Sequence, residues 1–175
     1  MQRAKTDRIL QILIGLCLVV LVFAIAHVFR RTVVEVGDTA PNFSIAADDG
    51  RVISRSDFGG RLLVLNFWAT WCGTCIQEMP SLDQFQKTFA GSGVVVLGIS
   101  VDRNEQTYRA FLRQTRVTFL TARDPEARIS TEYGTFKFPE TYVIDSSGQV
   151  VQKIIGATNW TDDRMVSQIK ALLTS

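Results

Sequence analysis

Two segments that are apolar almost throughout, Leu62–Trp68 (LLVLNFW) and Val94–Ile99 (VVVLGI), constrain the fold of this chain more than any other feature. Such runs are typical of strands in a sheet that is covered on both faces. Between them, apolar residues recur at three- and four-residue spacing, which predicts an amphipathic helix. These residues are Ile76, Met79, Leu82, Phe85 and Phe89. The order strand, helix, strand predicts a right-handed βαβ unit, and hence an α/β fold.

The pattern continues on both sides of this unit. Short strands are expected at residues 42–45 and 51–53, joined by Asp48-Asp49-Gly50 as a hairpin turn. Later in the chain we expect helices over residues 104–114, 125–133 and 161–173, and strands over residues 117–120, 141–144 and 149–155. A chain of 175 residues is long enough for one domain with a proper hydrophobic core.

An uncharged run of 21 residues, Ile9–Phe29, lies ahead of these elements. As a helix it would span ~31 Å, close to the hydrocarbon core of a bilayer. We interpret residues 9–29 as a transmembrane anchor, residues 1–8 as a cytoplasmic tail and residues 30–36 as a linker. The slight basic excess before the run favours a cytoplasmic amino terminus. A cleaved signal peptide ending near Ala24-Ile25-Ala26 is the alternative, and either interpretation exports the domain of residues 37–175.

The charge of the chain gives no sign of a nucleic-acid partner. The formal net charge is +2, but residues 31–175 carry 15 basic and 16 acidic side chains. A domain that is nearly neutral lacks the basic surface on which binding to phosphate backbones depends.

The stretch WATWCGTC places Cys72 and Cys75 two residues apart, directly after the first apolar strand. Because the helix is expected to begin just after Cys72, the free N–H groups and the dipole of its first turn would stabilise a thiolate there. The Cys-x-x-Cys arrangement also lowers the pKa of the thiol. Cys72 would attack a target disulfide, and Cys75 would then resolve the mixed disulfide.

Other roles for the two cysteines need residues that the sequence does not supply. A zinc site takes four ligands, but the other cysteine and the histidine, Cys17 and His27, both lie in the uncharged run. A covalent haem site has a histidine after the second cysteine, where this chain has Ile76. A purely structural disulfide would close too small a loop to contribute much. We therefore expect a redox pair, with no cofactor and no metal.

Four stretches resemble the membrane-anchored thioredoxin-like proteins of the TlpA/ResA/CcmG (DsbE) group over residues 35–173: VGDTAPNFSI, LLVLNFWATWCGTC, IQEMP and FPETYVID. The resemblance implies a thioredoxin-like fold of the TlpA/AhpC-TSA type, in which helices flank a central mixed sheet. An amino-terminal β-hairpin extends this fold, and a βα insertion, here residues 101–122, enlarges it. Thioredoxin itself is a poorer match, because it has a buried Asp where this chain has Asn66.

The resemblance also assigns roles to single residues. Glu78 would exchange the proton of Cys75, which lies three residues earlier on the same helix face. Pro139 would be cis, and Phe138 and Pro139 would bind an extended substrate strand. Trp71 is expected at the contact surface with partner proteins, and Trp68 in the core. Glu140 matches the CcmG-like branch, although a solvent-facing acid in a loop explains it equally well.

The function implied is the reduction of protein disulfides outside the bacterial cytoplasmic membrane. The leading substrate is the cysteine pair of apocytochrome c during cytochrome c maturation, with a membrane electron carrier of the DsbD or CcdA type as donor. One alternative is a redox assembly factor, for example in maturation of the copper site of cytochrome oxidase. Another is a disulfide donor, because both directions use the same two sulfurs. A thiol peroxidase is remote, since the Pro-x-x-x-Thr-x-x-Cys arrangement is absent from the sequence around Cys75.

Overall fold

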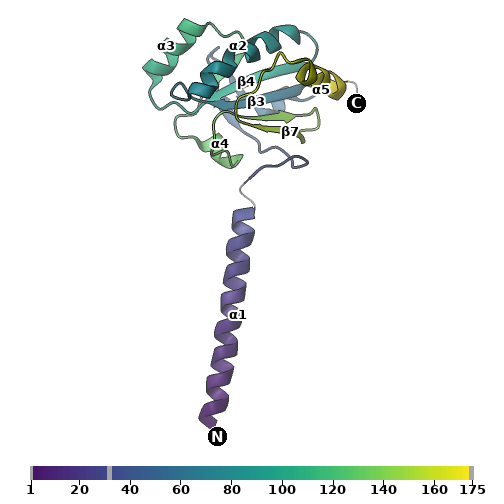
Figure 1. The fold of residues 1–175 in the computed structure, drawn as a ribbon. Coiled ribbons are helices and arrows are strands. Elements are labelled where there is room, and N and C mark those ends of the chain that lie inside the picture. The colour runs from purple at the N-terminus through teal and green to yellow at the C-terminus, as the bar shows by residue number, and fades with distance from the viewer. Residues whose placement is uncertain (1, 31–32, 174–175) are drawn as a thin grey trace. The chain divides into compact units, whose positions relative to one another are not determined.

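The computed structural model describes residues 2–30 and 33–173, and the chain divides between Val33 and Val34 into two units. The first contains helix α1 (Gln2–Arg30) (Figure 1). Within the described residues, no helix has both the length and the apolar character needed to cross a membrane. The anchor expected over residues 9–29 is therefore not confirmed. Residue 1 of the expected tail and residues 31–32 of the expected linker lie outside the described residues.

The second unit is built on a mixed five-stranded sheet with the strand order β5-β4-β3-β6-β7. Its strands are β3 (Leu62–Trp68), β4 (Val94–Ser100), β5 (Leu120–Arg123), β6 (Glu140–Ile144) and β7 (Val150–Ile155). The first three run parallel, whereas β6 pairs antiparallel with both β3 and β7. All seven residues of β3 are buried, as its apolar run predicts for a central strand. The thioredoxin-like α/β fold with a mixed sheet is thus confirmed.

Helices and an amino-terminal hairpin cover the two faces of this sheet. One hydrophobic cluster joins the sheet to α2 (Gly73–Thr88), α3 (Glu105–Thr115) and α5 (Asp163–Leu173). A second cluster lies on the other face, under α4 (Arg128–Glu132) and the hairpin of β1 (Ser44–Ala46) and β2 (Val52–Ser54). In Figure 1, α2 and α4 accordingly lie on opposite sides of the strands. The expected hairpin and βα insertion are both present.

Three elements differ most from the sequence-based expectation, whereas the others are displaced by at most two residues at either end. Strand β5 begins at Leu120 rather than at residue 117, because Leu120 pairs with Leu97 while Thr118 bonds to Asp83 of α2. Helix α4 begins at Arg128 instead of residue 125, because the chain first makes a turn in which the Ala127 N–H donates to the carbonyl of Asp124. The 3-10 helix η1 (Arg55–Phe58) was not expected. Asp57 stabilises its start by accepting hydrogen bonds from Ser54.

Gly98 occupies a position in β4 where even a methyl group would not fit. A Cβ added there would lie 2.8 Å from Cε2 of Phe119 and 3.0 Å from Nε1 of Trp68, both buried side chains. The indole of Trp68 therefore packs against the bare backbone of the neighbouring strand. This contact brings the end of β3, just before the two cysteines, close against β4.

We predict that Gly98→Ala lowers the free energy of unfolding by about 1–3 kcal/mol, because overpacking a buried site forces its neighbours apart. The urea midpoint of the full-length chain measures the effect. Gly73→Ala is the control, since a Cβ at Gly73 meets nothing within 4 Å. Equal midpoints for the two variants would show that the contact with Trp68 does not constrain β4.

Candidate active site

The two cysteines lie at the start of α2, four to seven residues beyond the end of β3. Cys72 is the N-cap residue, and its Sγ accepts a hydrogen bond from the backbone N–H of Cys75 at 3.2 Å. The two residues are joined by a disulfide, with their Cα atoms 5.2 Å apart. Cys72 is 8% exposed and Cys75 is 1% exposed. The sulfur nearer the surface is therefore the one that the helix amino terminus stabilises as a thiolate.

Glu78 lies one turn after Cys75 on α2 and is 3% exposed. Burial raises the pKa of its carboxyl group to about 7, against hydrogen bonds from Trp160, Thr158 and Asn66 that favour the ionised form. Its Oε1 accepts from the indole Nε1 of Trp160 at 2.5 Å and from the backbone N–H of Thr158 at 3.4 Å. A carboxyl group with this pKa can both hold and release a proton near neutral pH.

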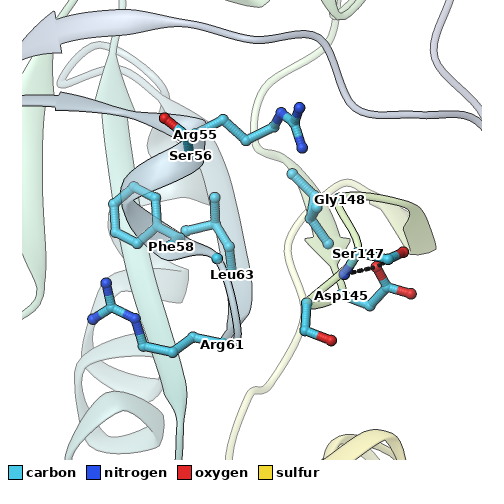
Figure 2. A pocket seen from close by; sticks show the side chains of 11 residues that line it. Arg55, Ser56, Phe58, Arg61, Leu63, Asp145, Ser147 and Gly148 are labelled. Carbon is cyan, nitrogen blue, oxygen red and sulfur yellow. Dashed lines mark hydrogen bonds between the residues drawn. The ribbon is translucent and has the colours of Figure 1, made fainter.

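One pocket of the domain is not lined by the two cysteines or by Glu78. It has an empty volume of about 310 Å³ and lies between η1 and the turn after β6, and Figure 2 shows its lining. The side chains of Arg55 and Arg61 extend from its walls in different directions, and Asp145 accepts hydrogen bonds from Ser147 within its own turn (Figure 2).

A different pocket is lined by Glu78. It has an empty volume of about 480 Å³, and Gln77, Ser81 and residues 157–159 also line it. The carboxyl group is thus buried by its neighbours yet borders an opening to solvent.

Trp160 and Thr158 were not anticipated as part of this site. They come from the segment before α5, where Thr158 lies 80 and Trp160 lies 82 residues after Glu78, and Trp160 is completely buried. Its indole also packs against Phe85 of α2, with ring centroids 5.2 Å apart. A single tryptophan before a helix carries no sequence signal for a partner so distant along the chain. Only the fold shows it.

The peptide bond between Phe138 and Pro139 is cis, as expected from the resemblance. Phe138 is half-buried and packs against the cluster that contains both cysteines. Trp71 is 67% exposed, and its ring meets that of Phe138 edge to face with centroids 5.8 Å apart. The loop before β6 therefore lies beside the loop that carries Cys72. Trp68, in contrast, is fully buried in the core, as predicted.

The interpretation of Glu140 as a solvent-facing acid in a loop is wrong. Glu140 is the first residue of β6 and is 1% exposed. Its Oε1 accepts a hydrogen bond from the hydroxyl of Tyr142 at 2.7 Å and lies 3.4 Å from Nζ of Lys153. Lys153 in turn donates to the carbonyl of Val34 at 2.9 Å. A buried carboxylate needs such partners, and they tie the residue after Pro139 into the protein interior.

No cluster of three or more His, Cys, Asp or Glu side chains that could hold a metal ion occurs among the residues that the structure describes. Cys17, the other cysteine, is exposed on α1 and forms no disulfide. The site brings together two sulfurs, one buried carboxyl group and the exposed aromatic ring of Trp71.

Comparisons with known proteins place this geometry in context. The model of the AhpC/TSA family matches residues 36–153. The thiol-disulfide oxidoreductase ResA of Bacillus thuringiensis subsp. konkukian (strain 97-27) is 34% identical over 122 residues, or 70% of each chain. The thioredoxin-like protein YneN of Bacillus subtilis (strain 168) is 37% identical over 123 residues, 69% of this chain and 71% of its own. The crystal structure of a thiol:disulfide interchange protein described as DsbE, from Chlorobium tepidum, is 31% identical with a TM-score of 0.74. It covers 80% of this chain and 99% of its own.

We predict that the stability of the oxidised protein falls between pH 4.5 and pH 7 because of Glu78. The pKa of Glu78 is raised from its usual 4.5 to about 7 in the folded state, so the folded protein holds this proton over a range where the unfolded chain loses it. The free energy of unfolding should therefore drop as pH rises, by up to about 3 kcal/mol. Urea unfolding at a series of pH values measures the drop.

Glu78→Gln should remove this part of the pH dependence, since an amide does not titrate. Glu126→Gln, at an exposed position, is the matched control and should leave it in place. A drop of the same size in Glu78→Gln and in the unaltered chain would contradict the raised pKa.

Proposed function

Because the chain belongs to the AhpC/TSA family and, within it, to the TlpA/ResA/CcmG group of thioredoxin-like proteins, we propose that it is a thiol-disulfide oxidoreductase that reduces protein disulfides outside the cytoplasm. The observation that carries this proposal is the Cys72–Cys75 pair at the start of α2, with one sulfur near the surface and the other buried. Such a pair can cycle between dithiol and disulfide by thiol–disulfide exchange.

In the proposed reaction, the reduced protein carries Cys72 as a thiolate. This thiolate attacks one sulfur of the target disulfide, a mixed disulfide forms, and the other target sulfur leaves as a thiolate that takes up a proton. Cys75 then loses its proton and attacks Sγ of Cys72. The second target sulfur leaves as a thiolate and takes up a proton from solvent, so that the target gains two electrons and two protons while Cys72 and Cys75 become a disulfide.

Glu78 is proposed to accept the proton that Cys75 loses in the second step. Cys75 is the more buried sulfur, so solvent alone is poorly placed to take this proton. A neighbouring carboxyl group with a pKa of about 7 suits the task, because it is partly ionised at neutral pH. The pocket beside Gln77 and Ser81 would let the proton pass on to solvent.

The substrate is proposed to bind across the contacting rings of Trp71 and Phe138, with Phe136 two residues earlier in the chain. Trp71 and Phe136 are 67% and 71% exposed, and aromatic side chains of this kind are enriched where proteins contact their partners. The carbonyl of Pro139 already accepts a hydrogen bond from the N–H of Gly156, at 2.8 Å. Pairing with an extended substrate strand would therefore fall to the backbone of Phe138.

The finer assignment is to the cysteine pair of apocytochrome c before haem attachment, with re-reduction by a membrane carrier of the DsbD or CcdA type. It is supported by the group to which the chain belongs. A tether through residues 9–29 and a location on the outer side of the bacterial cytoplasmic membrane belong to the same proposal. They are supported by the uncharged run in the sequence.

We predict that Cys75→Ser accumulates a mixed disulfide through Cys72 when the reduced chain meets an oxidised peptide with a Cys-x-x-Cys-His sequence, the haem-attachment pattern. The resolving thiol is then absent, so the first step cannot proceed to the second. Mass spectrometry of the acid-quenched mixture detects the adduct. All variants should carry Cys17→Ser, because Cys17 is exposed and free to react.

Cys72→Ser is the matched control and should form little adduct, since Cys75 is buried. Glutathione disulfide in place of the peptide tests the preference for a polypeptide. Adducts through Cys75, or none with either substrate, would count against the assigned order of attack.

A further inference from the structure

Asp102 is a buried acid that the thiol chemistry does not use. It lies two residues beyond β4 and is 3% exposed. A carboxylate in such a place is costly unless hydrogen bonds replace its lost water. The hydrogen-bond donors around the carboxylate of Asp102 therefore indicate its role in the structure.

Three hydrogen bonds to this carboxylate come from side chains and backbone near the cysteines. Oδ2 of Asp102 accepts from the backbone N–H of Thr70 at 2.8 Å, and Oδ1 accepts from the hydroxyl of Thr70 at 2.6 Å. Oδ2 also accepts from the hydroxyl of Ser100, at the end of β4, at 2.6 Å. Thr70, two residues before Cys72, thus directs both its backbone N–H and its hydroxyl at the carboxylate of Asp102.

The loop held in this way is short and tightly connected. The N–H of Cys72 donates to the carbonyl of Ala69 at 3.2 Å, and the N–H of Val101 donates to the carbonyl of Trp68 at 3.0 Å. A displacement of Thr70 would therefore move Trp71 and Cys72 with it. Cys72 would lose its alignment with the N–H of Cys75, the hydrogen bond that stabilises its thiolate.

We propose that Asp102 is a positioning residue for the redox reaction. Acting through Thr70, it fixes the loop of residues 69–72 to the end of β4 and so holds the sulfur of Cys72 at the start of α2. The inference rests on the proposed thiol-disulfide function and adds to it a residue that touches neither substrate nor sulfur. The charged neighbour Arg123 contacts the carbonyl of Asp102, at 3.4 Å, and so leaves the carboxylate to Thr70 and Ser100.

Asp83 supplies a matched control within the same chain. Its Oδ1 accepts from the backbone N–H of Thr118 at 2.5 Å and from the hydroxyl of Thr118 at 2.8 Å. This is the same aspartate–threonine pairing, placed later on α2 and away from Cys72. Asp83 is less buried than Asp102 and also pairs with Lys87 at 2.6 Å. A general effect of losing a hydrogen-bonded carboxylate should still appear at both positions, whereas a positioning effect should appear at Asp102 alone.

The test compares Asp102→Asn, Thr70→Val and Asp83→Asn in the reduced full-length chain with Cys17→Ser. The rate at which iodoacetamide alkylates Cys72 is measured over pH, which gives both its thiolate pKa and its limiting rate. The rate of attack on the oxidised Cys-x-x-Cys-His peptide is measured alongside. We expect Asp102→Asn and Thr70→Val to raise the thiolate pKa and to slow attack about tenfold, because small misplacements of a reacting group are costly.

Thr70→Ser keeps both donors and should restore the rate, and Asp83→Asn should leave it unchanged. If Asp102→Asn fails to fold, Thr70→Val and Thr70→Ser decide, since they alter only a side chain of Thr70. Equal pKa values and rates for Thr70→Val and the unaltered chain would overturn the inference, as would an equal loss in Asp83→Asn. Failure of the proposed function would look different, because the unaltered chain would then not reduce the peptide at all.

Discussion

The position of Cys72 as the N-cap of α2, four residues beyond a fully buried strand, is the constraint on which the rest of this site depends. Strand β3 is paired on both edges, with β4 and with β6, so the point where it ends is fixed by the sheet. A short loop, residues 69–72, leads from there to the helix, and the N–H of Cys75 in the first turn meets the sulfur of Cys72. The reactive sulfur is therefore only slightly exposed and lies next to the central strand of the sheet.

Differences in burial and in hydrogen-bond partners give chemically similar residues near the start of α2 different proposed roles. Of the two cysteines, the more exposed suits attack on a target and the more buried suits resolution. Three buried acids likewise differ in their partners. Glu78 contacts an indole and has its pKa raised by burial, Glu140 contacts Lys153, and Asp102 binds the loop before Cys72. The proposed mechanism assigns proton transfer to Glu78, the acid whose pKa burial raises to about 7.

The sequence predicted what depends on local pattern. The apolar runs located β3 and β4 closely, and the family resemblance supplied the cis bond before Pro139, which composition alone does not predict. The sequence did not predict contacts between residues far apart in the chain, such as those of Trp160 with Glu78 and of Asp102 with Thr70. It also placed the start of α4 too early, because the turn from Asp124 to Ala127 depends on hydrogen bonds rather than on helical periodicity.

The direction of electron flow is the central claim, since the same two sulfurs would serve a reductase or an oxidase. The reduction potential of Cys72 and Cys75, measured in the full-length chain with Cys17→Ser against glutathione at pH 7, tests it most directly. The account predicts a value near or below that of thioredoxin, about −270 mV. A value near that of DsbA, about −120 mV, would contradict it and would make the protein a donor of disulfides.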